Sequence, residues 1–388
     1  MSTVPGESAH TAPGHVAVCG GGLVGSSLVL ALRAAGRDVR VHDADPEVRQ
    51  VLRSVLAADV ADSWAEAATD AAVVVAAVPP PAIPRVLAEA AAVAGPSALL
   101  TDVAGVKQAV VERVSAALAP YDGALSRYVG GHPMAGSERS GPNAADATLF
   151  SGATWILTPT AHTADDALAR AGDLVRALGA RVLVLAPEDH DTIVGLVSHL
   201  PQLVASVLAD VAAEAVGSAR DAVMAVAGPG FRDTTRIAAS DVELWLDIIG
   251  GNRPAVVSAL AAFEARLATV RSAVVEHDDE ALATVLRRAS EARRRLVPKG
   301  IDEPTRDLLV PLRDRPGEIA RITGALGSAG INIEDLAMRH ASAADRGSLL
   351  LRVRSDATSR AVEVLSAADV EGVVIEADPV SDGSRARP

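Results

Sequence analysis

The sequence predicts an α/β fold in three parts: a doubly wound sheet, an all-helical part and a small βαββαβ domain. Strand and helix patterns alternate in the first part, as a mainly parallel sheet with helices on both faces requires. The second part has long apolar stripes of helical period, which is typical of a bundle that buries its stripes against a second subunit. Strands return in the third part. The predicted boundaries are a disordered tail (1–14), the sheet domain (15–188), the helical domain (189–297), a linker (298–306), the βαββαβ domain (307–378) and a second tail (379–388).

Composition and charge limit the classes of function. Of the 388 residues, 49 % are hydrophobic, and the formal net charge is −13. That charge argues against nucleic acid as a partner. Because prolines and charges interrupt every apolar run, we expect no membrane span, and the first residues lack the features of a signal peptide. The single cysteine, Cys19, cannot form an intrachain disulfide, which favours the cytoplasm, and we expect no metal site.

The first strand and helix predict a dinucleotide site of the Rossmann type. An apolar strand pattern at 15–19 leads into Gly20-Gly-Gly-Leu-Val-Gly25, and a helical stretch follows at 26–35. The first glycine of such a motif makes the turn, the second admits a pyrophosphate, and the third lets the helix pack on the strand. The helix N-terminus supplies N–H groups to the phosphates. The expected cofactor-binding residues are Gly20, Gly22, Leu23, Val24, Gly25, Asp43, Val78 and Pro79.

The next two strands favour NAD as the cofactor. The strand at 38–42 ends at Asp43, close to the spacing at which an acid binds the ribose 2′-hydroxyl. Ala44 and Asp45 follow, with no arginine nearby to hold a 2′-phosphate. The strand at 72–78 is cut by three prolines, where a strand would stop beside a nicotinamide. A phosphate-free βαβ unit remains the alternative.

The rest of the sheet domain carries a candidate base. The pattern predicts a strand end and loop at 101–107, a helix at 108–119, a strand at 155–158, a helix at 163–177 and a strand at 180–185. Residues 130–139 read Gly-Gly-His-Pro-Met-Ala-Gly-Ser-Glu-Arg, a poor helix or central strand but a suitable rigid loop. Because an imidazole titrates near neutral pH, His132 is a candidate general base. A turn whose histidine only caps a neighbour is the alternative.

The third part follows the order of a βαββαβ domain. The pattern predicts a strand at 307–312, a helix at 318–329, a strand from 330 to 333, a strand at 349–354, a helix at 356–367 and a strand at 373–377.

These motifs together resemble the prephenate dehydrogenases of tyrosine biosynthesis, with a C-terminal ACT domain. The resemblance covers nearly all of 15–378. Its carriers are the glycine motif, Thr101–Lys107, Gly130–Glu138, Leu149–Pro159, His190-Asp191, Ser198-His-Leu-Pro201, and Gly230–Ile237 with Trp245. Asp314–Gly317 and Gly330–Ile333 carry the ACT resemblance.

The resemblance implies an NAD-dependent oxidative decarboxylation. Prephenate would lose hydride from C4, the proton of its C4 hydroxyl and its C1 carboxylate, to give 4-hydroxyphenylpyruvate, CO2 and NADH. His132 would accept the hydroxyl proton, and Arg236 would hold the ring carboxylate. Asp233 and Glu138 would position or shield Arg236. The implied substrate-binding residues are His199, Gln202, Ser137, Glu138 and Asp233. His190-Asp191 is expected to be a structural pair and Trp245 to be core packing, while Lys107 would neutralise an anion or be solvated.

Two positions depart from the family pattern. Gly105 stands where the family has a serine that orients the catalytic histidine, so a water or another hydroxyl would have to substitute. Gln202 stands where prephenate-using relatives often carry a second histidine after Ser-His-Leu-Pro. A neutral amide accepts as well as donates hydrogen bonds, which makes arogenate a rival substrate; a 4-amino-4-deoxy analogue is a remoter one.

Two other classes stay open, a non-catalytic NAD and amino-acid sensor and a generic β-hydroxyacid dehydrogenase. The presence of both His132 and Arg236 argues against the sensor. The resemblance also implies a homodimer and tyrosine as an effector of the ACT domain. We expect N–H groups near Gly317 to bind the carboxylate of the effector, and Asn332 to bind its ammonium. An ACT domain that only strengthens the dimer is the alternative.

Overall fold

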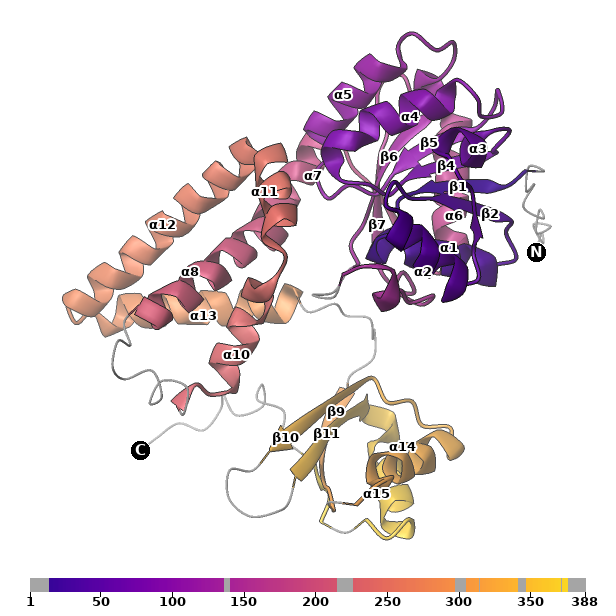
Figure 1. Cartoon of the computed structure of the whole chain (residues 1–388). Coiled ribbons are helices and arrows are strands. Elements are labelled where there is room, and N and C mark those ends of the chain that lie inside the picture. Colours follow the sequence, from indigo (N-terminus) through magenta and orange to yellow (C-terminus); the bar gives the residue numbers. More distant parts are fainter. Residues whose placement is uncertain are drawn as a thin grey trace, which may run out of the picture. The chain divides into compact units, whose positions relative to one another are not determined.

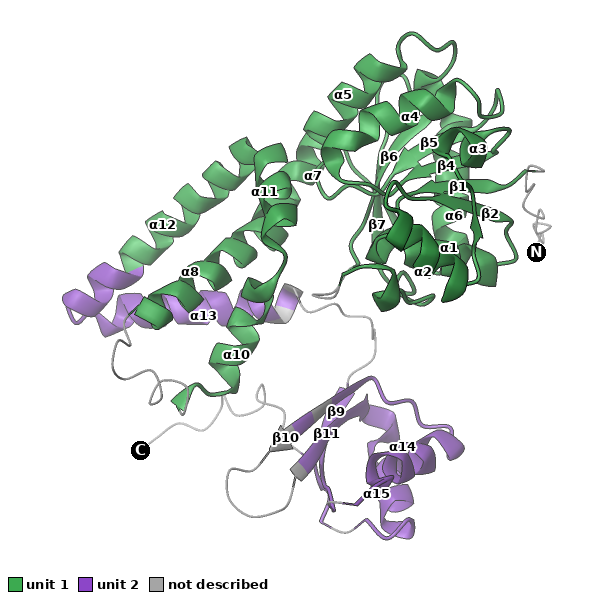
Figure 2. Cartoon of the chain, viewed as in Figure 1, with its two compact units in different colours: residues 1–269 green, residues 270–388 purple. Residues whose placement is uncertain are grey.

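The computed structural model describes residues 14–135, 140–214, 226–296, 305–313, 315–340, 347–370 and 372–375. Both expected tails, except for residue 14, and most of the expected linker therefore lie outside the described residues. The chain divides into two compact units, Met1–Thr269 and Val270–Pro388 (Figure 2). The division falls inside one long helix, α12 (Arg253–Val275).

The first unit contains an eight-stranded sheet in the order β3-β2-β1-β4-β5-β6-β7-β8 (Figure 1). Every neighbouring pair is parallel except β6 and β7. The order reverses between β1 and β4, and such a switch point is where doubly wound sheets bind their ligands. The strands are β1 (Val16–Cys19), β2 (Val39–His42), β3 (Asp59–Val60), β4 (Val73–Ala76), β5 (Leu99–Asp102), β6 (Tyr128–Pro133), β7 (Thr154–Thr158) and β8 (Arg181–Val184).

Helices cover both faces of this sheet, as the sequence predicts. Side chains alternate along each strand, so Val16 and Val18 face one layer while Ala17 and Cys19 face the other. One layer contains α1 (Leu23–Ala34), α2 (Pro46–Ser54) and α6 (Asp165–Ala177). The opposite layer contains α3 (Trp64–Ala68), α4 (Ile83–Ala91) and α5 (Gln108–Leu118). Three short 3₁₀ helices connect these elements: η1 (Pro80–Ala82), η2 (Leu125–Arg127) and η3 (Pro142–Ala144).

The expectation that His132 is carried by a loop was wrong, because residues 128–133 form the strand β6. Strand β6 pairs with β7 in antiparallel register, with His132 opposite Ile156. The glycines that argued against a strand are what permit this one. A Cβ at Gly130 would lie 2.4 Å from Oγ1 of Thr158, and a Cβ at Gly131 would lie 2.5 Å from the backbone oxygen of Asp102.

The expectation that no apolar stretch is long enough for a membrane also needs correction. α7 (Pro187–Val194), a π-helical turn η4 (Gly195–His199) and α8 (Leu200–Glu214) run on as one helix. By length and composition alone this helix is long and apolar enough to cross a membrane, and 28 % of its apolar window is buried. Pro201 lies directly after the π-helical turn, and the helix continues through it. His190, Asp191 and His199 lie within it and are buried.

The first unit continues with α10 (Pro229–Thr235), a 3₁₀ helix η6 (Arg236–Ala239), α11 (Val242–Gly251) and the start of α12. α10 begins directly after Gly228. Gly251 ends α11 close to the loop after β5, since a Cβ there would lie 2.9 Å from Cγ2 of Val106.

The second unit contains the rest of α12, α13 (Asp279–Leu296) and a βαββαβ domain. This domain comprises β9 (Thr305–Pro311), α14 (Glu318–Ser328), β10 (Asp335–His340), β11 (Gly347–Arg354), a 3₁₀ turn η7 (Ser355–Ala357), α15 (Thr358–Ala367) and β12 (Val374–Ile375). Its antiparallel sheet has the order β10-β11-β9-β12. The predicted order of elements is confirmed, but the second strand starts at Asp335 rather than at Gly330, because residues 330–333 form the turn that leaves α14.

Candidate active site

The glycine motif lies between the ends of β1 and β4, at the switch point of the sheet. A Cβ at Gly20 would lie 2.1 Å from the backbone oxygen of Ala77, and one at Gly25 would lie 2.0 Å from that of Gly20. At Gly22, by contrast, no described protein atom lies within 4 Å of such a Cβ. The first and last glycines therefore bring backbones together, whereas the middle one faces open space, as a pyrophosphate requires. Leu23 and Val24 begin α1 beside that space.

Asp43 closes the motif from the end of β2. Its Oδ2 accepts a hydrogen bond from the Gly21 N–H at 2.6 Å, and its Oδ1 accepts one from the Asp45 N–H at 2.8 Å. The expectation that no arginine lies nearby was wrong. Arg49 is one turn into α2, and its Nη1 donates to the backbone oxygen of Asp43 at 2.6 Å and to that of Ala44 at 3.0 Å. At the end of β4, Val78 lies against Gly20, and Pro79 precedes η1.

A cavity of about 490 Å³ lies between the sheet and the helices of the first unit. The sheet side contributes Gly105 from the loop after β5 and His132 from β6. The helical side contributes polar, basic and aromatic residues. These are Ser198, His199, Gln202, Arg236, Ser240, Asp241 and Trp245. The structure thus brings together four of the residues that the sequence singled out for the substrate, namely His132, His199, Gln202 and Arg236.

A buried ion pair supports the strand that carries His132. Lys107 and Asp102 are fully buried and in contact, and Nζ of Lys107 also donates to the backbone oxygen of Gly131 at 2.6 Å. The Tyr128 hydroxyl donates to the other carboxylate oxygen of Asp102 at 2.8 Å. Burial lowers the pKa of Lys107, and Asp102 opposes that shift. Lys107 is therefore neither solvated nor exposed to a ligand, and it joins β5 to β6 instead.

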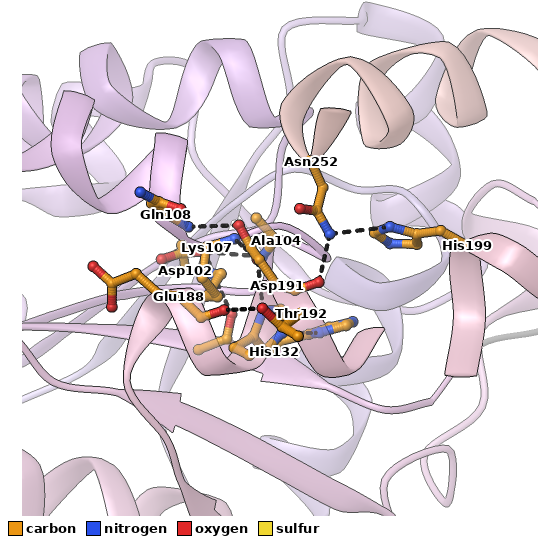
Figure 3. Close-up of polar contacts among 12 residues, drawn as sticks. Asp102, Ala104, Lys107, Gln108, His132, Glu188, Asp191, Thr192, His199 and Asn252 are labelled. Atoms are coloured by element: carbon orange, nitrogen blue, oxygen red, sulfur yellow. Dashed lines mark hydrogen bonds and ion pairs between the residues drawn. The ribbon is translucent and has the colours of Figure 1, made fainter. Parts of the chain in front are cut away.

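His132 is held through a chain of side chains from the long helix (Figure 3). Nδ1 of His132 lies 2.8 Å from Nε2 of His190, and Nδ1 of His190 lies 2.8 Å from Oδ1 of Asp191. The Asp191 carboxylate also accepts the backbone N–H groups of Lys107 at 2.8 Å and of Gln108 at 2.9 Å, at the start of α5. The expected His190-Asp191 pair thus exists, and it contacts His132 directly.

His199 is held through a different residue. Nδ2 of Asn252 donates to the backbone oxygen of Asp191 at 2.7 Å and lies 3.2 Å from Nδ1 of His199 (Figure 3). The ring of Trp245 meets that of His199 edge to face, with centroids 5.9 Å apart. Trp245 lines the cavity as well as packing on His199, so it is more than core packing.

Burial keeps both imidazoles of the cavity neutral. Desolvation lowers the pKa of His132 well below its usual range, and the nearby His190 and Lys107 lower it further. Desolvation also lowers the pKa of His199 to about 4, although Asp191 acts in the opposite direction. A neutral imidazole has one lone pair and one N–H, so each ring can accept or donate one proton at neutral pH.

Other expected site residues do not join the cavity in the part of the chain that is described. Asp233 is exposed on α10 and is not among the described lining residues. Ser137 and Glu138 lie outside the described residues. Gly317 and Asn332 belong to the second unit. Gly317 caps α14 with a φ of +85°, and Asn332 is exposed in the turn before β10.

Two residues that hold the site were missed from the sequence. Asn252 ends α11 after two glycines, where a polar residue ordinarily reads as a helix cap. Tyr128 looked like one more apolar residue before the glycines. A buried hydroxyl or amide needs a partner, but the partners are 26 residues away for Tyr128 and 61 away for Asn252.

Two family models match the first unit and the start of the second. Residues 28–184 match the nucleotide-binding domain of prephenate dehydrogenase, and residues 186–288 match the dimerization domain of prephenate dehydrogenase. A prephenate dehydrogenase of Bacillus subtilis is 31 % identical over 372 residues, which cover 94 % of this chain and 98 % of the relative.

Solved structures agree with this match. Prephenate dehydrogenase from Aquifex aeolicus, in complex with hydroxyphenyl propionate and NAD+, has a TM-score of 0.68 at 28 % identity and covers 74 % of this chain and 100 % of that one. Arogenate dehydrogenase from Synechocystis has a TM-score of 0.63 at 28 % identity and covers 73 % of this chain and 100 % of that one.

Proposed function

The chain belongs to the prephenate dehydrogenase family, and from that premise we propose that it oxidises prephenate with NAD to 4-hydroxyphenylpyruvate, CO2 and NADH, a step of tyrosine biosynthesis. The observation that carries the proposal is the cavity that His132 and Arg236 share at the ends of β5 and β6. It combines a neutral base with a cation, and the reaction needs both.

The turn after β1 fits NAD. Gly22 leaves room for a pyrophosphate, and the N-terminus of α1 supplies backbone N–H groups to it. Asp43 lies where an acid binds the 2′-hydroxyl of the adenine ribose. Val78 and Pro79, at the end of β4, would lie beside the nicotinamide. The bound nicotinamide supplies the hydride acceptor, and the rest of the chemistry belongs to the protein.

His132 acts as the base. Its lowered pKa leaves the ring neutral, and a neutral ring accepts the proton of the C4 hydroxyl as hydride leaves C4. Its Nε2 lies at the cavity wall, 3.6 Å from where a Cβ at Gly105 would be. The family's serine at that position would lie beside Nε2, whereas Nδ1 is already held by His190. His190 therefore orients the ring from its Nδ1 side, independently of the residue at position 105.

Arg236 holds the ring carboxylate of the substrate. The guanidinium fork binds a carboxylate through two parallel hydrogen bonds, so it orients the ring as well as attracting it. As that carboxylate leaves as CO2, the ring becomes aromatic. The net charge of −13 makes this local cation necessary for an anionic substrate.

The test is NADH formation, followed at 340 nm, when the purified chain is mixed with prephenate and NAD. We expect turnover and one CO2 per NADH. Absence of NADH with prephenate, under conditions where the chain binds NAD, would refute the proposal.

Arogenate is the second candidate substrate, and Gln202 favours it. Gln202 is buried and lines the cavity. Its amide can accept a hydrogen bond from the ammonium group by which arogenate differs from prephenate. A Gln202→His variant should therefore shift the ratio of kcat/KM toward prephenate. An unchanged ratio would remove Gln202 from the choice of substrate.

We infer that the βαββαβ domain is an ACT domain and that tyrosine, or a related aromatic amino acid, regulates the enzyme there. The topology is that of an ACT domain, and the Bacillus subtilis relative aligns over 94 % of this chain. Gly317 opens α14, so N–H groups at that end suit a carboxylate, while exposed Asn332 suits an ammonium. Tyrosine should inhibit the full chain and should inhibit an Asn332→Ala variant less. Equal inhibition of both would mean that tyrosine does not act through Asn332.

The helical domain supports a homodimer. The domain leaves apolar side chains exposed along α8, α11 and α12, which is unusual for a surface that stays in water. These are Val207, Val211, Leu246, Val257 and Leu267. A second copy would cover this surface, and sedimentation equilibrium of the full chain should give twice the mass of 39.5 kDa.

A further inference from the structure

Asp191 lies at the centre of the hydrogen bonds that hold both imidazoles of the cavity. Its carboxylate reaches His132 through His190, and its backbone oxygen reaches His199 through Asn252. His190 is fully buried, and Asp191 and Asn252 are each less than 5 % exposed. Each of these bonds has a direction, because some of the groups can only donate and others can only accept.

The directions of the hydrogen bonds that lead from Asp191 through His190 to His132 follow from the Asp191 end. The carboxylate accepts two backbone N–H groups at the start of α5, which can only donate, so its oxygens act as acceptors. Nδ1 of a neutral His190 therefore carries the proton that Oδ1 accepts, and Nε2 of His190 carries a lone pair. The 2.8 Å bond to His132 then requires a proton on Nδ1 of His132. The lone pair of His132 is left on Nε2, at the wall of the cavity beside Gly105.

The directions of the hydrogen bonds that lead from Asp191 through Asn252 to His199 follow in the same way. They give His199 the opposite tautomer to that of His132. The backbone oxygen of Asp191 can only accept, so Asn252 presents its NH2 group there. The second hydrogen of that group points to Nδ1 of His199, which must then be an acceptor. A neutral His199 therefore carries its proton on Nε2.

We propose that Asp191 is the positioning residue that sets the two imidazoles in opposite tautomers, through His190 for His132 and through Asn252 for His199. The cavity then presents a lone pair on one side, which accepts the hydroxyl proton of the substrate. On the other side it presents an uncharged N–H donor for a substrate oxygen. The catalytic meaning of these tautomers rests on the proposed function, whereas the tautomers themselves follow from the hydrogen bonds alone.

The Asp191 arrangement also explains how the site works without the family's serine. When His132 takes the proton on Nε2, it becomes an imidazolium whose Nδ1–H points through His190 toward the Asp191 carboxylate. The carboxylate stabilises that charge and holds the ring in the plane of transfer. Gly105 leaves the Nε2 side open for substrate.

The decisive measurement is the ¹⁵N spectrum of the full chain with ¹⁵N-labelled histidine, because protonated and bare ring nitrogens resonate far apart. Among the signals of the nine histidines, those of His132 and His199 are assigned with the variants His132→Gln and His199→Gln. We expect His132 to be protonated on Nδ1 alone and His199 on Nε2 alone at neutral pH. The reverse tautomer for either ring would overturn the proposal. This holds even if the chain forms no NADH from prephenate or arogenate, in which case only the proposed function fails.

An Asp191→Asn variant tests the positioning role. The amide keeps only one of the two acceptor oxygens, so one backbone N–H at the start of α5 faces an NH2 group, and the charge that stabilises the His132 imidazolium is lost. We expect kcat to fall by roughly 10²–10⁴-fold, as for loss of a general base, with NAD affinity unchanged. Asp189→Asn is the matched control, because Asp189 is exposed two residues earlier in the same helix. An Asp191→Asn enzyme with native tautomers and a native kcat would overturn the proposal.

An Asn252→Ala variant tests the other branch. The variant removes the hydrogen bond to His199 and leaves the bonds between Asp191, His190 and His132 in place. We therefore expect KM to rise roughly fivefold, which corresponds to the loss of about one hydrogen bond, while kcat changes little. Loss of kcat at an unchanged KM would mean that Asn252 does not act through His199. NAD affinity and the thermal unfolding midpoint establish that each variant is folded.

Discussion

The cofactor turn and the substrate cavity lie at neighbouring places on one sheet, yet they are built in different ways. The turn is made by the backbone of six consecutive residues, Gly20 to Gly25, with Asp43 closing it from the next strand. The cavity is made by side chains that meet from distant parts of the chain, such as His132 on β6 and Trp245 on α11. A site made by local backbone is encoded in a short motif, whereas a site made by distant side chains is encoded in the fold.

The largest expected effect is on turnover, and it concerns the substrate cavity. A His132→Asn variant removes the base, so we expect turnover with prephenate to fall by roughly 10²–10⁴-fold. NAD affinity should remain nearly native, because the glycine turn does not involve His132. Steady-state kinetics and NAD titration measure the two quantities. His162→Asn, at an exposed position of the same domain, serves as the control. Near-native turnover of the His132 variant would exclude it as the base.

The cofactor turn can be tested by two alanine substitutions of its glycines. Gly25→Ala places a Cβ 2.0 Å from a backbone oxygen that cannot move aside, so it should destabilise the fold by about 1–3 kcal/mol. Gly22→Ala meets no described atom within 4 Å, so the fold should keep its stability while KM for NAD rises about tenfold. Denaturant unfolding and NAD kinetics separate the two effects. If both variants lose stability alike, the middle glycine serves the fold rather than the cofactor.

This difference explains what the sequence could predict. The strand, turn and helix of the cofactor site follow local rules, as does the alternation of elements in the first 188 residues, and these predictions are confirmed. Strand β6 was missed because local rules disfavour Gly-Gly-His-Pro, whereas the tertiary fold needs glycines at 130 and 131 to fit against Thr158 and Asp102. Lys107 was expected to neutralise an anion or to be solvated, because the sequence does not reveal that Asp102, five residues earlier, is buried with it.

The cofactor preference belongs to the cofactor turn, where Asp43 lies at the end of β2 and Arg49 comes from the following helix. An Asp43→Asn variant removes the charge that repels a 2′-phosphate. We expect the ratio of kcat/KM for NAD over NADP to fall about tenfold. Asp38→Asn, exposed just before the same strand, is the control. If the ratio does not change, another residue sets the preference.

The last expected effect is on stability at acidic pH, and it concerns the two imidazoles of the cavity. His199 is buried and His132 half-buried in the folded chain, and desolvation lowers the pKa of His199 to about 4 and that of His132 well below its usual range. In the unfolded chain both rings bind a proton below their ordinary pKa of about 6.5. Between that pH and about 4 the unfolded state therefore holds more protons than the folded state, so stability falls as the pH falls.

Each of these rings contributes at most about 1.4 kcal/mol per pH unit to that slope. A His199→Gln variant cannot bind the extra proton, so its free energy of unfolding should fall less steeply than that of the wild type between pH 6.5 and 4. His162→Gln should leave the slope unchanged, because that histidine is exposed. Urea titrations at half-unit intervals measure the slopes. Equal slopes for the wild type and the His199 variant would mean that His199 takes up its proton equally in both states. Its ring would then not be held neutral by burial.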